Sequence, residues 1–139
     1  MSEHSEQVTV IKWFRLTYPR YRGALFAIPN GAVLCDLPDS KRRARMGYLR
    51  DEGFRAGVSD LFLALPTEHY HGLWIEMKDQ KKTISDVSPE QKLFLFEMQR
   101  YFYAAYWAAG CDHAMDIIKR YMLGFDNAKY HVGRLEETF

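Results

Sequence analysis

Two acidic residues and a lysine stand near the middle of this chain of 139 residues, beside segments with the character of β-strands. Asp60 directly precedes the apolar run 61–65, which is short for a helix and is typical of a buried strand. Glu76 and Lys78 lie at the end of a second strand-like segment, 72–78. Because side chains alternate along a strand, Glu76 and Lys78 are expected to share one face.

The polar connection 66–71 between these segments predicts a hairpin. Antiparallel pairing then places Asp60 opposite about Met77, with a register that can differ by one or two residues. Asp60 reaches the face of Glu76 and Lys78 if the register differs by one residue or the backbone bends at the strand start. The sequence therefore predicts that Asp60, Glu76 and Lys78 gather at the open end of the hairpin.

Such a group is costly at the edge of an apolar hairpin unless something compensates its charges. A divalent hard cation would do so, since Mg²⁺ binds a few carboxylates together with waters and phosphate oxygens. The main-chain carbonyl of Met77 could supply a further oxygen ligand. A bound metal would polarise a phosphate and lower the pKa of a bound water, and Lys78 would orient or deprotonate that water or neutralise developing charge. The alternative is a simple Glu76–Lys78 salt bridge on an exposed strand face.

The elements before this hairpin are expected to be a helix, a strand and a second helix. Glu3–Tyr18 carries apolar residues at helical spacing and stops at Pro19. Residues 24–28 form a short apolar run before a turn, which predicts a strand. Residues 40–52 predict a basic helix, capped by Asp39 or Ser40 and closed by Gly53.

After the hairpin, Ser88-Pro89-Glu90-Gln91 is a strong helix start, with a capping serine, proline at the first position and glutamine three residues after the cap. That helix is expected to run to about Arg100 and to precede a third buried strand at 102–107. Asp112 is expected to cap a last helix through Leu123. The sequence thus predicts an α/β fold in which a mixed central sheet is flanked by helices, in one domain spanning 1–139 with a tail at 124–139 that is left open.

Bulk composition is ordinary for a globular protein, with 47% hydrophobic and 27% charged residues. No apolar run reaches the roughly 20 residues that span a bilayer, and the polar, acidic N-terminus is unlike a signal peptide. Cys35 and Cys111 fit neither a disulfide framework nor a zinc knuckle. We therefore expect a soluble cytoplasmic protein without a membrane partner.

The net charge is only +1, but basic residues cluster in two places. Such clusters can contact a phosphate backbone, although they can also be solvated surface. The predicted DNA-contacting residues are Lys41, Arg42, Arg43, Arg45, Lys81 and Lys82.

The ordered set of Gly57-Val58-Ser59-Asp60, a hairpin, Glu76-Met77-Lys78 and the Ser88–Gln91 helix start resembles the VRR-NUC nucleases of the PD-(D/E)XK superfamily. Ile28-Pro29-Asn30 is also similar to a segment of that family. The resemblance covers roughly Glu3 to Met122 and implies a restriction-endonuclease-like core. Ser59 departs from the proline of the superfamily name.

The resemblance implies Mg²⁺- or Mn²⁺-dependent hydrolysis of DNA phosphodiester bonds. It casts Asp60 and Glu76 as metal ligands, Lys78 as the catalytic lysine and Gln91 as a further residue near the metal or the scissile phosphate. The family also tends to place a glutamate of its first helix near the metal, for which Glu6 is the choice and Glu3 the alternative.

Stand-alone domains of this family resemble junction-resolving enzymes that act as homodimers. The resemblance therefore implies branched DNA as the partner, with four-way (Holliday) junctions as the expected substrate. Alternatives are a nuclease for flaps, single strands or general duplex DNA, a non-catalytic DNA-binding module, and an assembly subunit whose charged strand face is only surface.

Overall fold

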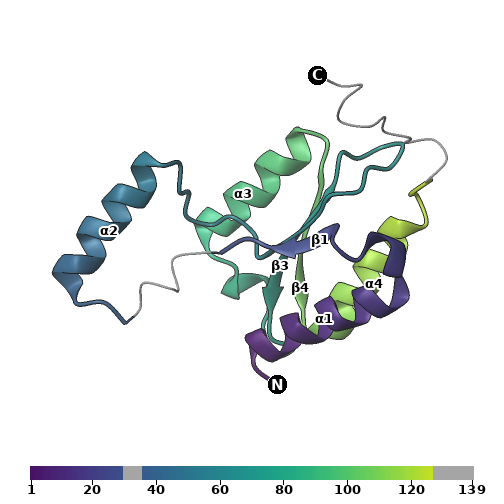
Figure 1. The fold of residues 1–139 in the computed structure, drawn as a ribbon, viewed down its shortest axis with the longest axis horizontal. Helices are drawn as coiled ribbons and strands as arrows, with labels where there is room; N and C mark the ends of the chain where they lie inside the picture. Colours follow the sequence, from purple (N-terminus) through teal and green to yellow (C-terminus); the bar gives the residue numbers. More distant parts are fainter. Residues whose placement is uncertain (30–35, 127–139) are drawn as a thin grey trace.

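A mixed four-stranded sheet forms the centre of the molecule, as shown in Figure 1. The structure is a computed structural model that describes residues 1–29 and 36–126. The strands lie in the order β1 (Leu25–Ala27), β2 (Leu61–Leu63), β3 (Leu73–Lys78) and β4 (Ala104–Ala109). The pairs β1–β2 and β2–β3 are antiparallel, whereas β3–β4 is parallel. The predicted α/β fold with a mixed sheet flanked by helices is confirmed.

One face of the sheet carries the main hydrophobic core beneath α1 (Glu3–Thr17) and α4 (Cys111–Met122). Alternate residues of β3 point into this core, and Ile75 and Met77 are fully buried there. Phe14 of α1 and Ile118 of α4 are fully buried against the same cluster. A short 3₁₀ helix, η1 (Pro19–Tyr21), follows α1 at the predicted proline stop.

The opposite face of the sheet packs against α3 (Pro89–Arg100) through aromatic rings. The ring of Trp74 lies 5.0 Å from that of Phe94 and 4.3 Å from that of Phe62, measured between centroids. A second 3₁₀ helix, η3 (Ile84–Asp86), lies shortly before α3. Trp74, Glu76 and Lys78 are spaced two residues apart along β3, so their side chains lie on the same face of the sheet, the one that α3 covers.

The basic helix α2 (Asp39–Asp51) stands apart from the rest of the molecule and contains no buried residue (Figure 1). The helix was expected at this position, but its predicted N-cap, Asp39 or Ser40, was wrong. Pro38 occupies the N-cap and makes no side-chain capping hydrogen bond. At the other end Gly53 has a φ of +100°, which is the left-handed conformation that ends a helix, as expected.

The starts of two predicted elements differ from the structure, and β2 ends at Leu63 rather than Leu65. The third predicted strand begins two residues later than expected, because Phe102 adopts a left-handed φ of +67° and remains in the turn after α3. The last helix begins at Cys111, with Gly110 rather than Asp112 at the N-cap. Glu6 of α1 supplies the missing cap, since its Oε2 accepts a hydrogen bond from the main-chain N–H of Cys111.

The first residues of the predicted tail pack on the body of the molecule, since the ring of Phe125 meets that of Tyr21 edge-on at 5.0 Å. Residues 127–139, Asn30 and Cys35 lie outside the described residues. Within the part of the chain that the structure describes, no helix combines the length and the apolar character needed to cross a bilayer.

Candidate active site

The hairpin formed by β2 and β3 brings Asp60 beside Glu76. Leu61 pairs with Ile75 in an antiparallel register, so continuing by one residue places Asp60 opposite Glu76. The predicted partner, Met77, is one residue away from this position. The shift matters, because it puts the side chain of Asp60 on the same face as Glu76 and Lys78.

Asp60 is held by the main chain of β3. Its Oδ2 accepts a hydrogen bond of 2.7 Å from the N–H of Met77. Strand β2 begins at Leu61, so this N–H lies beyond the end of the β2–β3 pairing and is satisfied by the side chain instead. The N–H and C=O of one strand residue point to the same side, which directs the Met77 carbonyl toward Asp60 as well.

Glu76 is the most enclosed acidic group of the site, with 2% of its surface exposed. Its Oε1 accepts a 2.6 Å hydrogen bond from the Nε2 of Gln91 and lies 3.6 Å from the Nζ of Lys78. Its Oε2 is buried without a hydrogen-bond partner among the described residues. A buried carboxylate oxygen of this kind carries a desolvation cost that a cation would offset.

Gln91 is positioned by the start of α3. Its main-chain N–H donates to the Oγ of Ser88 at 3.2 Å, and its Oε1 accepts from the N–H of Ser88 at 2.9 Å. This capping box leaves the amide NH₂ pointing at Glu76. The same four residues that predict the helix start therefore also aim Gln91 into the site.

Gly57 allows the segment before Asp60 to pass close to the start of α3. Its φ is +87°, and a Cβ at this position would lie 2.5 Å from the main-chain carbon and oxygen of Glu90. No larger residue fits there without displacement of the backbone. This close approach brings the Asp60 side of the hairpin to the Gln91 end of α3.

Burial raises the pKa of both carboxyl groups of the hairpin site, Asp60 and Glu76. Burial, followed by the neighbouring charge of Asp60, raises the pKa of Glu76 to about 8 despite the opposing attraction of Lys78. Burial also raises the pKa of Asp60, although the hydrogen bond from Met77 opposes the shift. Such a pair is unstable with two negative charges unless a cation is present.

The N-terminal glutamate that interacts with this site is Glu3. Burial raises the pKa of Glu3, and its largest charge interactions are with Lys78 and Asp60. Glu6, the predicted choice, instead caps α4 through the N–H of Cys111. The structure thus places the alternative residue, one turn earlier on α1, nearer to the predicted metal ligands.

The donor set fits a hard divalent cation with an incomplete protein shell. No group of three or more His, Cys, Asp or Glu side chains forms a ready metal cage within the described residues. The carboxylates of Asp60 and Glu76, the latter with its unpartnered Oε2, and the Met77 carbonyl nevertheless all offer oxygen atoms to a cation. Mg²⁺ is commonly held by one or two carboxylates, with waters and substrate phosphates completing its shell.

A cleft of about 630 Å³ opens beside Asp60, Glu76 and Gln91 and extends to the C-terminal half of α2. Two arginines line it: Arg50, the last basic residue of the helix predicted to follow a phosphate backbone, and Arg55, which was not among the predicted DNA contacts. Arg55 forms a 2.7 Å ion pair with Glu97, and its guanidinium lies 5.3 Å from the centre of the Phe94 ring. The signal in the sequence was a basic residue between Gly53 and Gly57.

The predicted DNA contacts lie outside the cleft. Lys41, Arg43 and Arg45 are exposed on α2, whereas Arg42 bonds to the Leu37 carbonyl at 3.0 Å. On the loop after β3 the predicted contacts are Lys81, which is exposed, and Lys82, whose Nζ lies 3.9 Å from Asp86.

Comparison with solved structures identifies the architecture. A structure described as "VRR_NUC domain protein" superposes with a TM-score of 0.74 at 22% sequence identity, covering 91% of this chain and 92% of that chain. No protein-family model matches the chain, and no curated protein matches it. The chain therefore has a VRR-NUC domain fold with a restriction-endonuclease-like core, as the motifs predicted.

Proposed function

From this fold and from the carboxylates that converge in the cleft, we propose that the protein is a Mg²⁺- or Mn²⁺-dependent DNA endonuclease. The observation that carries the proposal is the placement of Asp60 and Glu76 on one face, where the Oε2 of Glu76 is buried without a hydrogen-bond partner among the described residues. A structural neighbour named for a nuclease domain supports the same class of function.

Each residue of the site has a distinct task in this proposal. Asp60, Glu76 and the Met77 carbonyl hold the cation, and Glu3 approaches from the start of α1. When bound, the cation supplies Lewis-acid polarisation of the phosphate and lowers the pKa of a coordinated water. Lys78, whose Nζ lies 3.6 Å from the Oε1 of Glu76, orients the attacking water, takes up its proton as a neutral amine, or as an ammonium neutralises charge that develops on the phosphate oxygens.

Gln91 and the arginines position the reacting groups. The amide of Gln91 fixes the orientation of the Glu76 carboxylate through its 2.6 Å hydrogen bond. Arg50 and Arg55 line the same cleft and carry guanidinium groups that suit phosphate oxygens. The exposed cations of α2 extend this positive surface along a DNA backbone.

We propose four-way junctions as the substrate and a homodimer as the active form. A junction has two equivalent strands to cut, and a two-fold dimer supplies two equivalent sites. Flap, single-strand or general duplex cleavage is the alternative substrate class. A DNA-binding module without activity would explain the arginines of the cleft. It would not explain why two carboxyl groups with raised pKa values, Asp60 and Glu76, lie together in it.

Labelled four-way junctions, flaps, single strands and duplexes, incubated with and without Mn²⁺, test the proposal. Cleavage should require the metal and should fall by on the order of 100-fold or more in Lys78→Ala. Lys12→Ala, an exposed lysine on α1, is the matched control and should cleave normally. Metal-independent cleavage, or full activity in Lys78→Ala, would contradict the proposed mechanism.

A further inference from the structure

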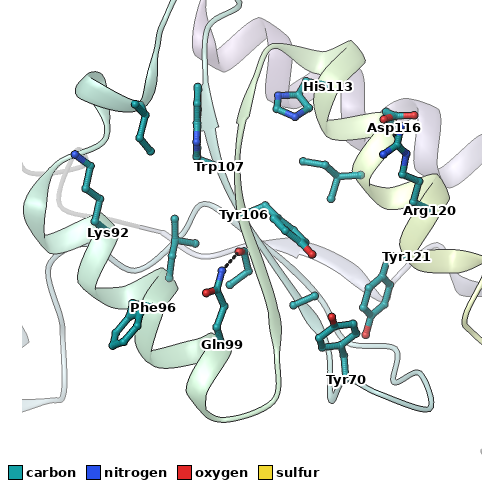
Figure 2. Close-up of a pocket in the computed structure, with 15 residues that line it drawn as sticks. Tyr70, Lys92, Phe96, Gln99, Tyr106, Trp107, His113, Asp116, Arg120 and Tyr121 are labelled. Carbon is teal, nitrogen blue, oxygen red and sulfur yellow. Dashed lines mark hydrogen bonds and ion pairs between the residues drawn. The ribbon is translucent and has the colours of Figure 1, made fainter.

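A groove of about 700 Å³ runs along β4 between α3 and α4, on the side away from β3 (Figure 2). β4 is the last strand of the sheet, so this edge has no neighbouring strand in the described part of the chain. Ala104 and Ala105 have small side chains and line the groove along β4. The ring of Phe96 on α3 is 57% exposed, and that of Tyr106 on β4 is 45% exposed. Exposed aromatic surface gathered at an open strand edge is typical of an interaction site.

The main-chain N–H and C=O groups of the odd-numbered residues of β4 point toward this groove. The N–H of Ala104 bonds to the Gly72 carbonyl and that of Gly110 to the Lys78 carbonyl, so the even-numbered positions face β3. Trp107, at the middle of the outer edge, directs its N–H and C=O away from β3. Neither group is bonded to any residue that the structure describes.

Side chains satisfy the outward groups on either side of Trp107. The carbonyl of Ala105 accepts a 2.8 Å hydrogen bond from the Nε2 of Gln99, drawn in Figure 2. The N–H of Ala109 donates to the Nδ1 of His113 at 3.0 Å. The edge therefore offers an acceptor at Ala105 and a donor at Ala109, placed symmetrically about Trp107.

We propose that the groove receives a second copy of this chain, whose β4 pairs antiparallel with this β4 about a two-fold axis at Trp107. Trp107 and the partner's Trp107 exchange both main-chain hydrogen bonds, as opposite residues of an antiparallel pair do. The Ala105 carbonyl and the Ala109 N–H then meet the matching groups of the partner strand. In a single chain, Gln99 and His113 occupy those two groups.

The charges on α4 are complementary under the same symmetry. An axis that pairs two edge strands antiparallel is perpendicular to the sheet, so α4 lies beside the partner's α4 in the opposite direction. Asp116 and Arg120 are one turn apart, 3.2 Å from each other, and their side chains are 54% and 79% exposed. Antiparallel α4 helices therefore place Asp116 near the partner's Arg120 and Arg120 near the partner's Asp116.

The use of this dimer in DNA cleavage rests on the proposed nuclease function. Rotation about an axis perpendicular to the sheet keeps both α3 faces on one side of the continuous sheet. The two clefts that contain Glu76 therefore open on a common face and point in opposite directions along the strands. One symmetric DNA molecule could contact both.

Sedimentation equilibrium of the full chain and of Phe96→Glu tests the surface. The wild type should be a dimer, and Phe96→Glu should raise the dissociation constant by on the order of 30-fold or more, since a charge replaces an apolar ring on the α3 wall of the groove. Leu16→Glu, at an 84% exposed apolar position on α1, is the matched control and should leave the dimer unchanged. Equal thermal melting of the two variants excludes misfolding as the cause.

Charge reversal on α4 adds a second test. Asp116→Arg and Arg120→Asp should each weaken the dimer, and the double reversal should restore it because opposite charges again face each other. A wild type that stays monomeric at about 0.1 mM, or a dimer indifferent to all these changes, would overturn the proposal. DNA cleavage assayed on the same samples separates the two ideas. A groove-dependent dimer without nuclease activity refutes only the function, and an active monomer refutes only the interface.

Discussion

Glu76 is the residue at which folding and function are most closely connected. It is almost fully buried, yet its environment contains a second carboxyl group and one ammonium. The raised pKa of about 8 means that the metal-free folded protein retains a proton that the unfolded chain releases near pH 4.5. A buried carboxyl group with so strongly raised a pKa is typical of a functional site.

This cost predicts a pH dependence of stability in the absence of metal. Because the folded pKa lies above the unfolded value, the stabilising contribution is complete below about pH 4.5 and is lost as pH rises through about 8. Melting temperatures measured in a chelator should therefore decline across this window, and Glu76→Gln should decline less steeply. Parallel melting curves for the two proteins would show that Glu76 is ionised throughout.

At the scale of elements, the segment 53–60 and the start of α3 form one unit. Gly57 lets the chain pass within contact of Glu90, and the capping box of α3 then directs Gln91 at Glu76. Gly57→Ala should destabilise the protein by about 1–3 kcal/mol, because the left-handed φ and the main-chain clash add together. Chemical denaturation measures this change.

Gly47→Ala on α2 is the matched control for that substitution. A Cβ at Gly47 meets no atom within 4 Å, and alanine favours a helix interior over glycine by about 1 kcal/mol. The control should therefore be neutral or stabilising. If Gly57→Ala were equally harmless, the close approach to Glu90 would not be what holds the two halves of the site together.

The isolated helix α2 makes a second prediction at this scale. A helix of 13 residues without a buried side chain gains little from tertiary packing, so its exposed cations are free to follow a phosphate backbone. Replacing Lys41, Arg43 and Arg45 with alanine should reduce the dependence of log DNA affinity on log salt by about 0.9 for each phosphate that these side chains no longer neutralise.

The salt titration needs a variant in which the same number of charges is removed elsewhere. Replacing Lys12, Arg15 and Arg20, which are exposed on or just after α1, removes three cations away from α2. The slope should stay at the wild-type value in this protein. Equal slopes in the two triple variants would mean that α2 acts only through bulk charge.

At the scale of the whole molecule, the sequence was most informative where local chemistry and long-range packing agree. The Ser88 cap and its helix follow from side-chain hydrogen bonds within four residues, and the fully apolar faces of β2 and β3 follow from burial. The gathering of Asp60 and Glu76 followed from hairpin pairing alone, with a register one residue from Met77, inside the one or two residues that the prediction allowed.

What the sequence could not supply depends on contacts between distant segments. The cap of α4 comes from Glu6, 105 residues away, so the choice between Glu6 and Glu3 could not be made from helical spacing. The shift of β4 depends on the left-handed Phe102, a conformation that a bulky residue rarely adopts. Arg55 becomes visible only when the folded cleft is assembled around it.

Calorimetric titration of the metal-free protein with Mn²⁺ tests the central claim most directly. We expect binding to the wild type that Asp60→Asn abolishes or weakens by about 10-fold or more, while Asp39→Asn, which removes an exposed carboxylate at the start of α2, binds like the wild type. Absence of heat from the wild type, or equal binding by Asp60→Asn, would contradict the conclusion that Asp60 and Glu76 share a metal ion.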